Sequence, residues 1–167
     1  IRKKKRDLTQ SCFEGIKLAK FPWVLIMDGD MQHDPKYIMP MIKLLNLKKS
    51  DMVIGIRNFN EYKKNNITTF IRINASILLK FLISFLLGFK SNDPLSGFFL
   101  FKKKIYFKNK KKFYGKGYKI LCDFLYNIEK INISDFKIKF KQRKKGKSKM
   151  NFLVLSNLVI FIIKNFF

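Results

Sequence analysis

Three carboxylates are concentrated in the stretch WVLIMDGDMQHDP, residues 23–35, although the whole chain has only eleven acidic residues against thirty-six basic ones. Asp28 and Asp30 are one residue apart, on a turn that Gly29 allows, so both can face one hard cation. Mg²⁺ and Mn²⁺ prefer oxygen ligands, often one or two carboxylates together with phosphates of a substrate. Gln32 offers a further oxygen. The spacing predicts a divalent-metal site formed by Asp28, Asp30 and Gln32.

Structural roles for the same residues remain open, because two aspartates at this spacing form a weak motif when taken alone. Asp28 could cap a turn, and Asp34 stands where it can cap the helix that Pro35 can begin. We expect that capping role for Asp34. His33, the only histidine, is expected at the surface or next to the metal ligands rather than among them.

The elements that must position these residues are predicted to alternate between helix and strand. Apolar periodicity predicts helices over residues 8–20 and 35–47, and short apolar runs predict strands buried on both faces over 23–27 and 51–56. This order is typical of an α/β domain with a doubly wound, mostly parallel sheet. Such sheets bind ligands at the carboxyl ends of their strands, which is where the two aspartates lie.

The remaining chain adds a polar segment and more helices and strands. Residues 57–66 have no periodicity and predict a mobile loop. Residues 67–87 predict a long helix that is apolar except for one stripe, formed by Arg72, Ser76, Lys80 and Ser84. Strands are predicted over 96–102 and 135–143, and helices over 118–129 and 152–163. The last helix is about 18 Å long, short of the about 30 Å bilayer core, so we expect it at a membrane interface or on the protein.

The composition favours an anionic partner. The net charge of +25 fits nucleic acid, phosphorylated substrates or an anionic membrane surface, although a coding bias toward Lys, Asn, Ile and Phe would give part of it. The 47% of apolar residues excludes a disordered basic tail. The lysines are scattered and no nucleic-acid-binding motif is present, so no nucleic acid is expected. Cys12 and Cys122 form no disulfide framework and are expected to be reduced, as on the cytosolic side of a membrane.

The stretch VLIMDGDMQHDPKYIMPMI resembles the D-x-D-x-Q segment of family 2 glycosyltransferases. More narrowly, it resembles polyprenyl-phosphate sugar transferases of the dolichyl-phosphate mannosyltransferase type. Five more segments follow in the order of that family: DMVIGIR, IRINAS, DPLSGFF, GKGYKILCDFL and FKIKFKQRKKGKSKM. The resemblance implies a GT-A fold, Rossmann-like and mostly parallel, over residues 1–150. It also implies that 151–167 begin a membrane-interface or transmembrane helix, and that the nucleotide-binding strands at the front of the family are missing, so that this piece alone would be inactive.

The resemblance implies a transfer reaction at the cytoplasmic face of a membrane. A nucleotide sugar, such as GDP-mannose, would be bound through Mg²⁺ or Mn²⁺, and its sugar would pass to a polyprenyl phosphate with inversion. Carried over by position, the metal and the donor diphosphate would be held by Asp28, Asp30 and Gln32. The acceptor phosphate would be held by Arg57, Arg72 and Ser76, and the sugar pocket would be lined by Ser96, Gly97 and Phe98. Further substrate contacts would come from Arg143, Ser148 and Lys149.

An acceptor phosphate is already anionic at neutral pH, so this reaction needs no general base. That fits a chain with a single histidine. Three alternatives remain open: a donor that carries glucose, N-acetylglucosamine or aminoarabinose on UDP, a noncatalytic membrane-associated subunit, and a basic nucleic-acid-binding module.

Overall fold

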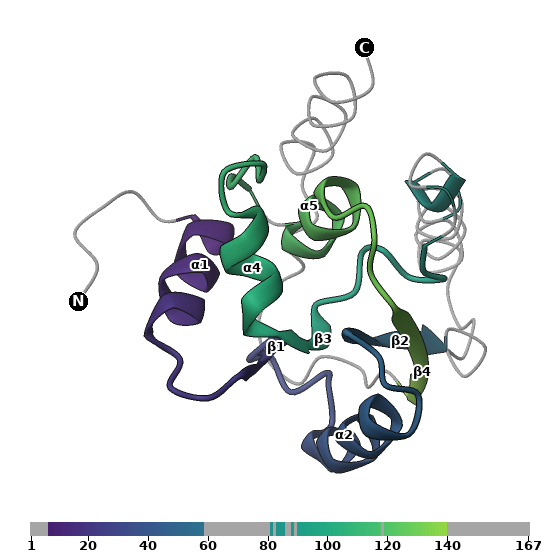
Figure 1. Ribbon diagram of the computed structural model, residues 1–167. Coiled ribbons are helices and arrows are strands. Elements are labelled where there is room, and N and C mark those ends of the chain that lie inside the picture. Colours follow the sequence, from purple (N-terminus) through teal and green to yellow (C-terminus); the bar gives the residue numbers. More distant parts are fainter. Residues whose placement is uncertain are drawn as a thin grey trace, which may run out of the picture.

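The computed structural model describes residues 7–58, 81, 83–85, 88, 90–117 and 119–139. Figure 1 shows a central sheet with helices packed around it. The described elements are, in chain order, α1 (Leu8–Leu18), β1 (Trp23–Met27), the 3₁₀ turn η1 (Pro35–Tyr37), α2 (Ile38–Leu47), β2 (Met52–Asn58), β3 (Phe98–Lys102), α4 (Lys103–Asn109), α5 (Ile120–Asn127) and β4 (Ile133–Lys139).

The four strands form one mixed sheet in the order β1-β3-β2-β4. Strand β3 pairs antiparallel with both β1 and β2, whereas β2 and β4 pair in parallel. Three strands therefore run in one direction and β3 runs against them. The predicted α/β class is confirmed, but the sheet is less parallel than predicted, because β3 is inserted between the two strands that flank the aspartate motif.

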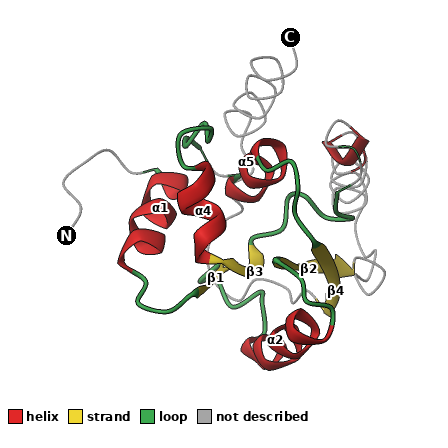
Figure 2. Cartoon of the chain, in the orientation of Figure 1, coloured by secondary structure: helices red, strands yellow, loops and turns green. Residues whose placement is uncertain are grey.

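Two apolar clusters cover the two faces of the sheet. One packs α1, α4 and α5 against the sheet and contains Phe13, Phe99, Phe101 and Phe124. The other contains Met41 and Leu45 of α2 together with Val53, Phe98, Leu100 and Ile138. Figure 2 shows α1, α4 and α5 on one side of the strands and α2 on the other. Residues 98–101 alternate between the two clusters, as the two-residue period of a strand requires.

Helix starts follow the capping residues in the sequence. The Asp7 side chain accepts a hydrogen bond from the Gln10 N–H at the start of α1. Asp34 accepts one from the Lys36 N–H, so its predicted capping role is confirmed, although Pro35 opens a 3₁₀ turn before α2 begins.

Strand burial differs from the prediction at β1. The predicted double burial holds for residues 52–55 of β2, which are fully buried. In β1 four residues are only partly buried and Met27 is exposed, because among the described strands β1 pairs with β3 alone.

Some boundaries also differ. Strand β2 continues through Asn58, so Arg57 lies in a strand and not in the predicted loop. Strand β4 begins two residues earlier than predicted, and helix α4 was not predicted.

Several predictions fall outside the described residues. These are most of the helix over 67–87 with Arg72 and Ser76, the basic segment with Arg143, Ser148 and Lys149, and the C-terminal segment 151–167. Within the described part of the chain, no helix is long and apolar enough to cross a membrane. Both cysteines are free, as predicted.

Candidate active site

Asp28 follows β1 directly, and its carboxylate lies against the backbone of Gly97. A methyl group added at Gly97 would come within 2.7 Å of the Asp28 carboxyl carbon and would overlap its Oδ2 oxygen. The Asp28 carboxylate can therefore occupy this position only because residue 97 has no side chain. The two predicted site residues Asp28 and Gly97 are brought together.

Asp30 and Gln32 share a tight turn. The Asp30 Oδ1 oxygen accepts a hydrogen bond from the Gln32 N–H at 3.1 Å. Between them, Met31 has a φ of 62°, in the left-handed region that non-glycine residues rarely adopt. The turn keeps the Asp28–Gln32 segment folded on itself at the carboxyl end of β1.

His33 is buried beneath this turn. Its ring stacks on Phe98, with centroids 5.1 Å apart and planes inclined by 20°. Burial lowers the pKa of His33 below its ordinary value, and the opposing effect of the Asp28 carboxylate does not outweigh it, so the imidazole is neutral at physiological pH. Of the two predicted positions, at the surface or next to the metal ligands, the structure supports the second. Phe98, predicted to line the sugar pocket, is fully buried below His33.

Arg57, at the carboxyl-terminal part of β2, forms a two-pronged ion pair with Asp93. Its Nε donates to Asp93 Oδ2 at 2.7 Å and its Nη2 donates to Oδ1 at 2.8 Å, while the backbone N–H of Arg57 also donates to Oδ2. The Asp93 side chain is completely buried and that of Arg57 is 15% exposed. Sequence reasoning assigned Arg57 to the acceptor phosphate and missed its partner, because an aspartate before a proline is typical of an ordinary turn.

A pocket of about 90 Å³ opens beside Asp28. It is walled by Leu8 and Cys12 of α1, by the end of β1, by residues 94–97 and by residues 119–121. Its lining residues include Ser96 and Gly97, for which the sequence resemblance predicted a place in the sugar pocket. The Ser96 hydroxyl is turned toward the sheet, where it donates to the Gly55 carbonyl at 2.7 Å. Lys119 also lines the pocket and was not predicted.

The candidate oxygen ligands for a divalent cation would be two carboxylates and one amide. No group of three or more His, Cys, Asp or Glu residues suited to a metal occurs among the described residues. A pair of carboxylates nevertheless fits Mg²⁺ or Mn²⁺, because such ions are commonly completed by substrate phosphates and water. Asp28 is exposed at the mouth of the pocket, where a phosphate could reach the same ion. Asp28, Asp30 and Gln32 would hold it.

The chain is similar in sequence to two curated glycosyltransferases. The chain is 25% identical over 158 residues to a dolichol-phosphate mannosyltransferase of Mycosarcoma maydis, covering 90% of this chain and 51% of that protein. It is 26% identical over 152 residues to the dolichol-phosphate mannosyltransferase of Pyrococcus furiosus, covering 89% of this chain and 42% of that protein. The chain thus spans about half the length of the curated relatives it matches.

Solved structures support the fold. Glucosyl-3-phosphoglycerate synthase of Mycobacterium tuberculosis, solved with Mn²⁺, UDP and glucosyl-3-phosphoglycerate, superimposes with a TM-score of 0.68. The match covers 96% of this chain and 56% of that one at 13% identity. At this identity the likeness concerns the GT-A fold alone. The family profile described as Glycosyl transferase family 2 matches residues 1–108, well over half of the 167 residues, and the chain therefore belongs to that family.

Proposed function

We propose that the protein is a polyprenyl-phosphate glycosyltransferase that uses a nucleotide-sugar donor and works at the cytoplasmic face of a membrane. The observation that carries the proposal is the Asp28–Gln32 turn at the carboxyl end of β1, with Asp28 pressed against Gly97 at the mouth of a pocket. The family membership and the names of the two relatives support the same activity.

The proposed reaction exchanges one bond at the sugar. An oxygen of the acceptor phosphate attacks the anomeric carbon, and the bond from that carbon to the donor diphosphate breaks with inversion. The nucleoside diphosphate leaves with the bonding electron pair. A divalent ion, when bound, would neutralise charge on the leaving diphosphate. No proton has to be removed from the acceptor, so the neutral, buried His33 is left a packing role.

Arg57 would serve this reaction from the second strand. Its guanidinium carries a fixed positive charge that acts electrostatically on His33, the residue after the aspartate turn, and Asp93 fixes its orientation. A preorganised cation of this kind can offset the charge of an acceptor phosphate without first reorienting. The sequence resemblance also gives candidates for binding the substrates: Arg72, Ser76, Arg143, Ser148 and Lys149.

The donor is proposed to be GDP-mannose, because both relatives bear the mannosyltransferase name. A UDP-sugar is the second candidate, because the structural neighbour was solved with UDP.

The test supplies the intact protein with membranes, Mn²⁺ or Mg²⁺ and labelled GDP-mannose, UDP-glucose or UDP-N-acetylglucosamine. We expect label in polyprenyl phosphate with one donor. No label with any of them rejects the proposal. Asp30→Ala should abolish transfer while the protein stays folded. The control Asp34→Ala removes a carboxylate that caps the next turn and lies 3.5 Å from the Lys36 ammonium, and it should keep transfer.

A further inference from the structure

Lys119 is a cationic side chain in the pocket beside Asp28, and it has no part in the reaction proposed above. It is partly buried and forms the N-cap of α5. The walls around it are mostly apolar, with Ile26, Leu95 and Ile120 among them, and Asp28 is the carboxylate that lines the same pocket. A lysine in such a setting needs a counter-charge.

Among the residues that the structure describes, the groups near Lys119 do not supply that counter-charge. Burial raises the pKa of Cys122 to about 12, so this thiol is neutral at physiological pH, and its Sγ lies 3.1 Å from the Pro94 carbonyl. The Asp93 carboxylate is already paired with Arg57 on both oxygens. Among the described residues, the Lys119 ammonium forms no hydrogen bond or ion pair. Burial lowers the pKa of Lys119, and the opposing effect of the Asp28 and Asp93 carboxylates does not offset it.

Asp28 is the remaining neighbour, and the proposed function commits it to a divalent ion. Once a dication lies on Asp28, Lys119 faces a positive centre across an apolar pocket. The amino end of α5 adds to this field, because Ile120 and Leu121 line the pocket and no side chain caps the helix there. Two positive centres that line one small, mostly apolar pocket repel each other, and an anion bound between them would offset that repulsion.

We propose that Lys119 is a further substrate-binding residue, whose ammonium would donate to an oxygen of the donor's diphosphate. The inference rests on the proposed function. It assigns the anion to the donor rather than to the acceptor, because the pocket opens onto Asp28, the residue expected to hold the metal–diphosphate. Lys119 would then balance the charge that develops on the leaving group.

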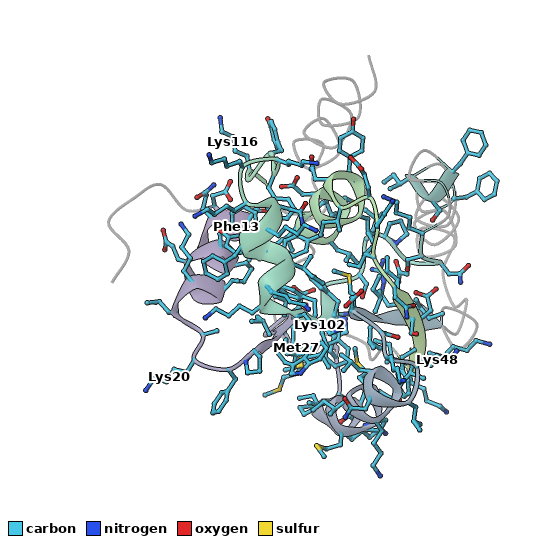
Figure 3. The ribbon with its side chains drawn as sticks, viewed as in Figure 1. Phe13, Lys20, Met27, Lys48, Lys102 and Lys116 are labelled. Atoms are coloured by element: carbon cyan, nitrogen blue, oxygen red, sulfur yellow. The ribbon has the colours of Figure 1, made fainter. Side chains whose placement is uncertain are left out.

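The first test measures binding rather than turnover. GDP, UDP, GMP and UMP are titrated into the intact protein with Mn²⁺, for the wild type, Lys119→Met and Lys116→Met. Lys116 is the matched control, an exposed lysine three positions away that is labelled at the periphery in Figure 3. Losing one charged hydrogen bond should weaken the preferred diphosphate by about ten- to a hundredfold in Lys119→Met. Binding of the corresponding monophosphate should change by less than about threefold, and Lys116→Met should behave as wild type.

A second measurement on the unmutated protein covers the case in which Lys119→Met does not fold. Acetylation of lysines is followed by mass spectrometry with and without nucleoside diphosphate and Mn²⁺. We expect the diphosphate to protect Lys119 and to leave Lys116 reactive. Farnesyl phosphate, added without nucleotide, serves as a probe of the acceptor phosphate and should not protect Lys119.

The outcomes separate this inference from the proposed function. Suppose that the wild type transfers sugar. If a folded Lys119→Met then binds the diphosphate as tightly as the wild type, or if the diphosphate does not protect Lys119, the inference is overturned and the proposed function still holds. Protection by farnesyl phosphate alone also overturns it, because the anion would belong to the acceptor. A wild type that binds neither diphosphate contradicts both.

Discussion

At the scale of single residues, the position of Asp28 depends on a missing side chain at residue 97. The carboxylate occupies the volume that a Cβ at Gly97 would need. Glycine is required there by close approach and not by backbone conformation, since Gly97 is not among the glycines with a positive φ. The spacing D-x-D was visible in the sequence, but the residue that fixes one of its carboxylates lies far along the chain.

Gly97→Ala should therefore damage the site more than the fold. The new methyl group must displace the Asp28 carboxylate, and a misplacement of about 1 Å at a reacting centre can reduce the rate by about a hundredfold. Transfer assays should show that loss, while the thermal midpoint should fall by only a few degrees. Gly29→Ala is the control, because a Cβ at Gly29 would meet nothing within 4 Å. Equal activity in the two variants would contradict this account.

At the scale of elements, the Arg57–Asp93 pair joins β2 to the loop before β3. Asp93→Ala leaves a largely buried guanidinium without its partner, and the expected loss is about 3–5 kcal/mol of unfolding free energy. Urea denaturation measures it. The control is Glu129→Ala, which breaks the exposed pair between Lys112 and Glu129, 3.6 Å apart, and should change stability by less than about 1 kcal/mol.

A double variant separates charge burial from packing. Arg57→Met combined with Asp93→Leu removes both charges together, so it should be more stable than Asp93→Ala alone. Transfer should still be lost if Arg57 offsets the acceptor phosphate. If Asp93→Ala lowers the free energy of unfolding no more than Glu129→Ala does, the Arg57–Asp93 pair does not stabilise the loop before β3.

Asp51 ties the starts of β2 and β4 to the end of β3. Its carboxylate accepts from the Lys102 ammonium at 2.6 Å and from the Asn132 N–H at 3.3 Å. Burial acts to raise the pKa of Asp51, but these hydrogen bonds outweigh it and the pKa is lowered. The folded state therefore binds this proton less readily than the unfolded state, so the stabilisation is present above the unfolded pKa of about 3.9 and is lost as pH falls through the lower folded value.

The predicted contribution of the Asp51–Lys102 pair to the free energy of unfolding is about 0.5–1 kcal/mol. It is small because the Asp51 and Lys102 side chains are 31% and 27% exposed and water screens the pair. Urea denaturation measures the free energy of unfolding at pH 6 and at about pH 3. Between these two pH values, it should fall less for Asp51→Asn than for the wild type. If the free energy of unfolding falls by the same amount in both proteins, Asp51 does not contribute to the pH dependence of stability.

The elements show where the sequence was sufficient for prediction and where it was not. Residues 23–27 form a continuous apolar run and residues 38–47 carry helical periodicity, and their strand and helix were predicted closely. Helix α4 has seven residues and no turn signal between it and β3, so local patterns could not separate it from the strand. The pairing of Asp93 with Arg57 and the place of Lys119 in the pocket were missed, because both depend on residues distant in sequence, which no spacing reveals.

At the scale of the whole molecule, a net charge of +25 should bring the protein to anionic surfaces before any specific contact forms. We predict that the protein sediments with phosphatidylcholine vesicles that contain phosphatidylserine, at low salt. Binding to phosphatidylcholine alone should be weaker. Raising the salt to about 1 M shortens the screening length from about 10 Å to about 3 Å and should release the electrostatically bound fraction.

Salt also separates the two classes of partner that the charge allows. Duplex DNA carries regular phosphates but no apolar layer, so binding to it would be lost at about 1 M salt. An enzyme whose acceptor is embedded in lipid should keep part of its vesicle binding under those conditions, because burial of apolar side chains is not screened. Retained binding to vesicles together with released DNA would favour the membrane function. Complete release from both, or absence of binding to the anionic vesicles at low salt, would contradict the proposed location at a membrane.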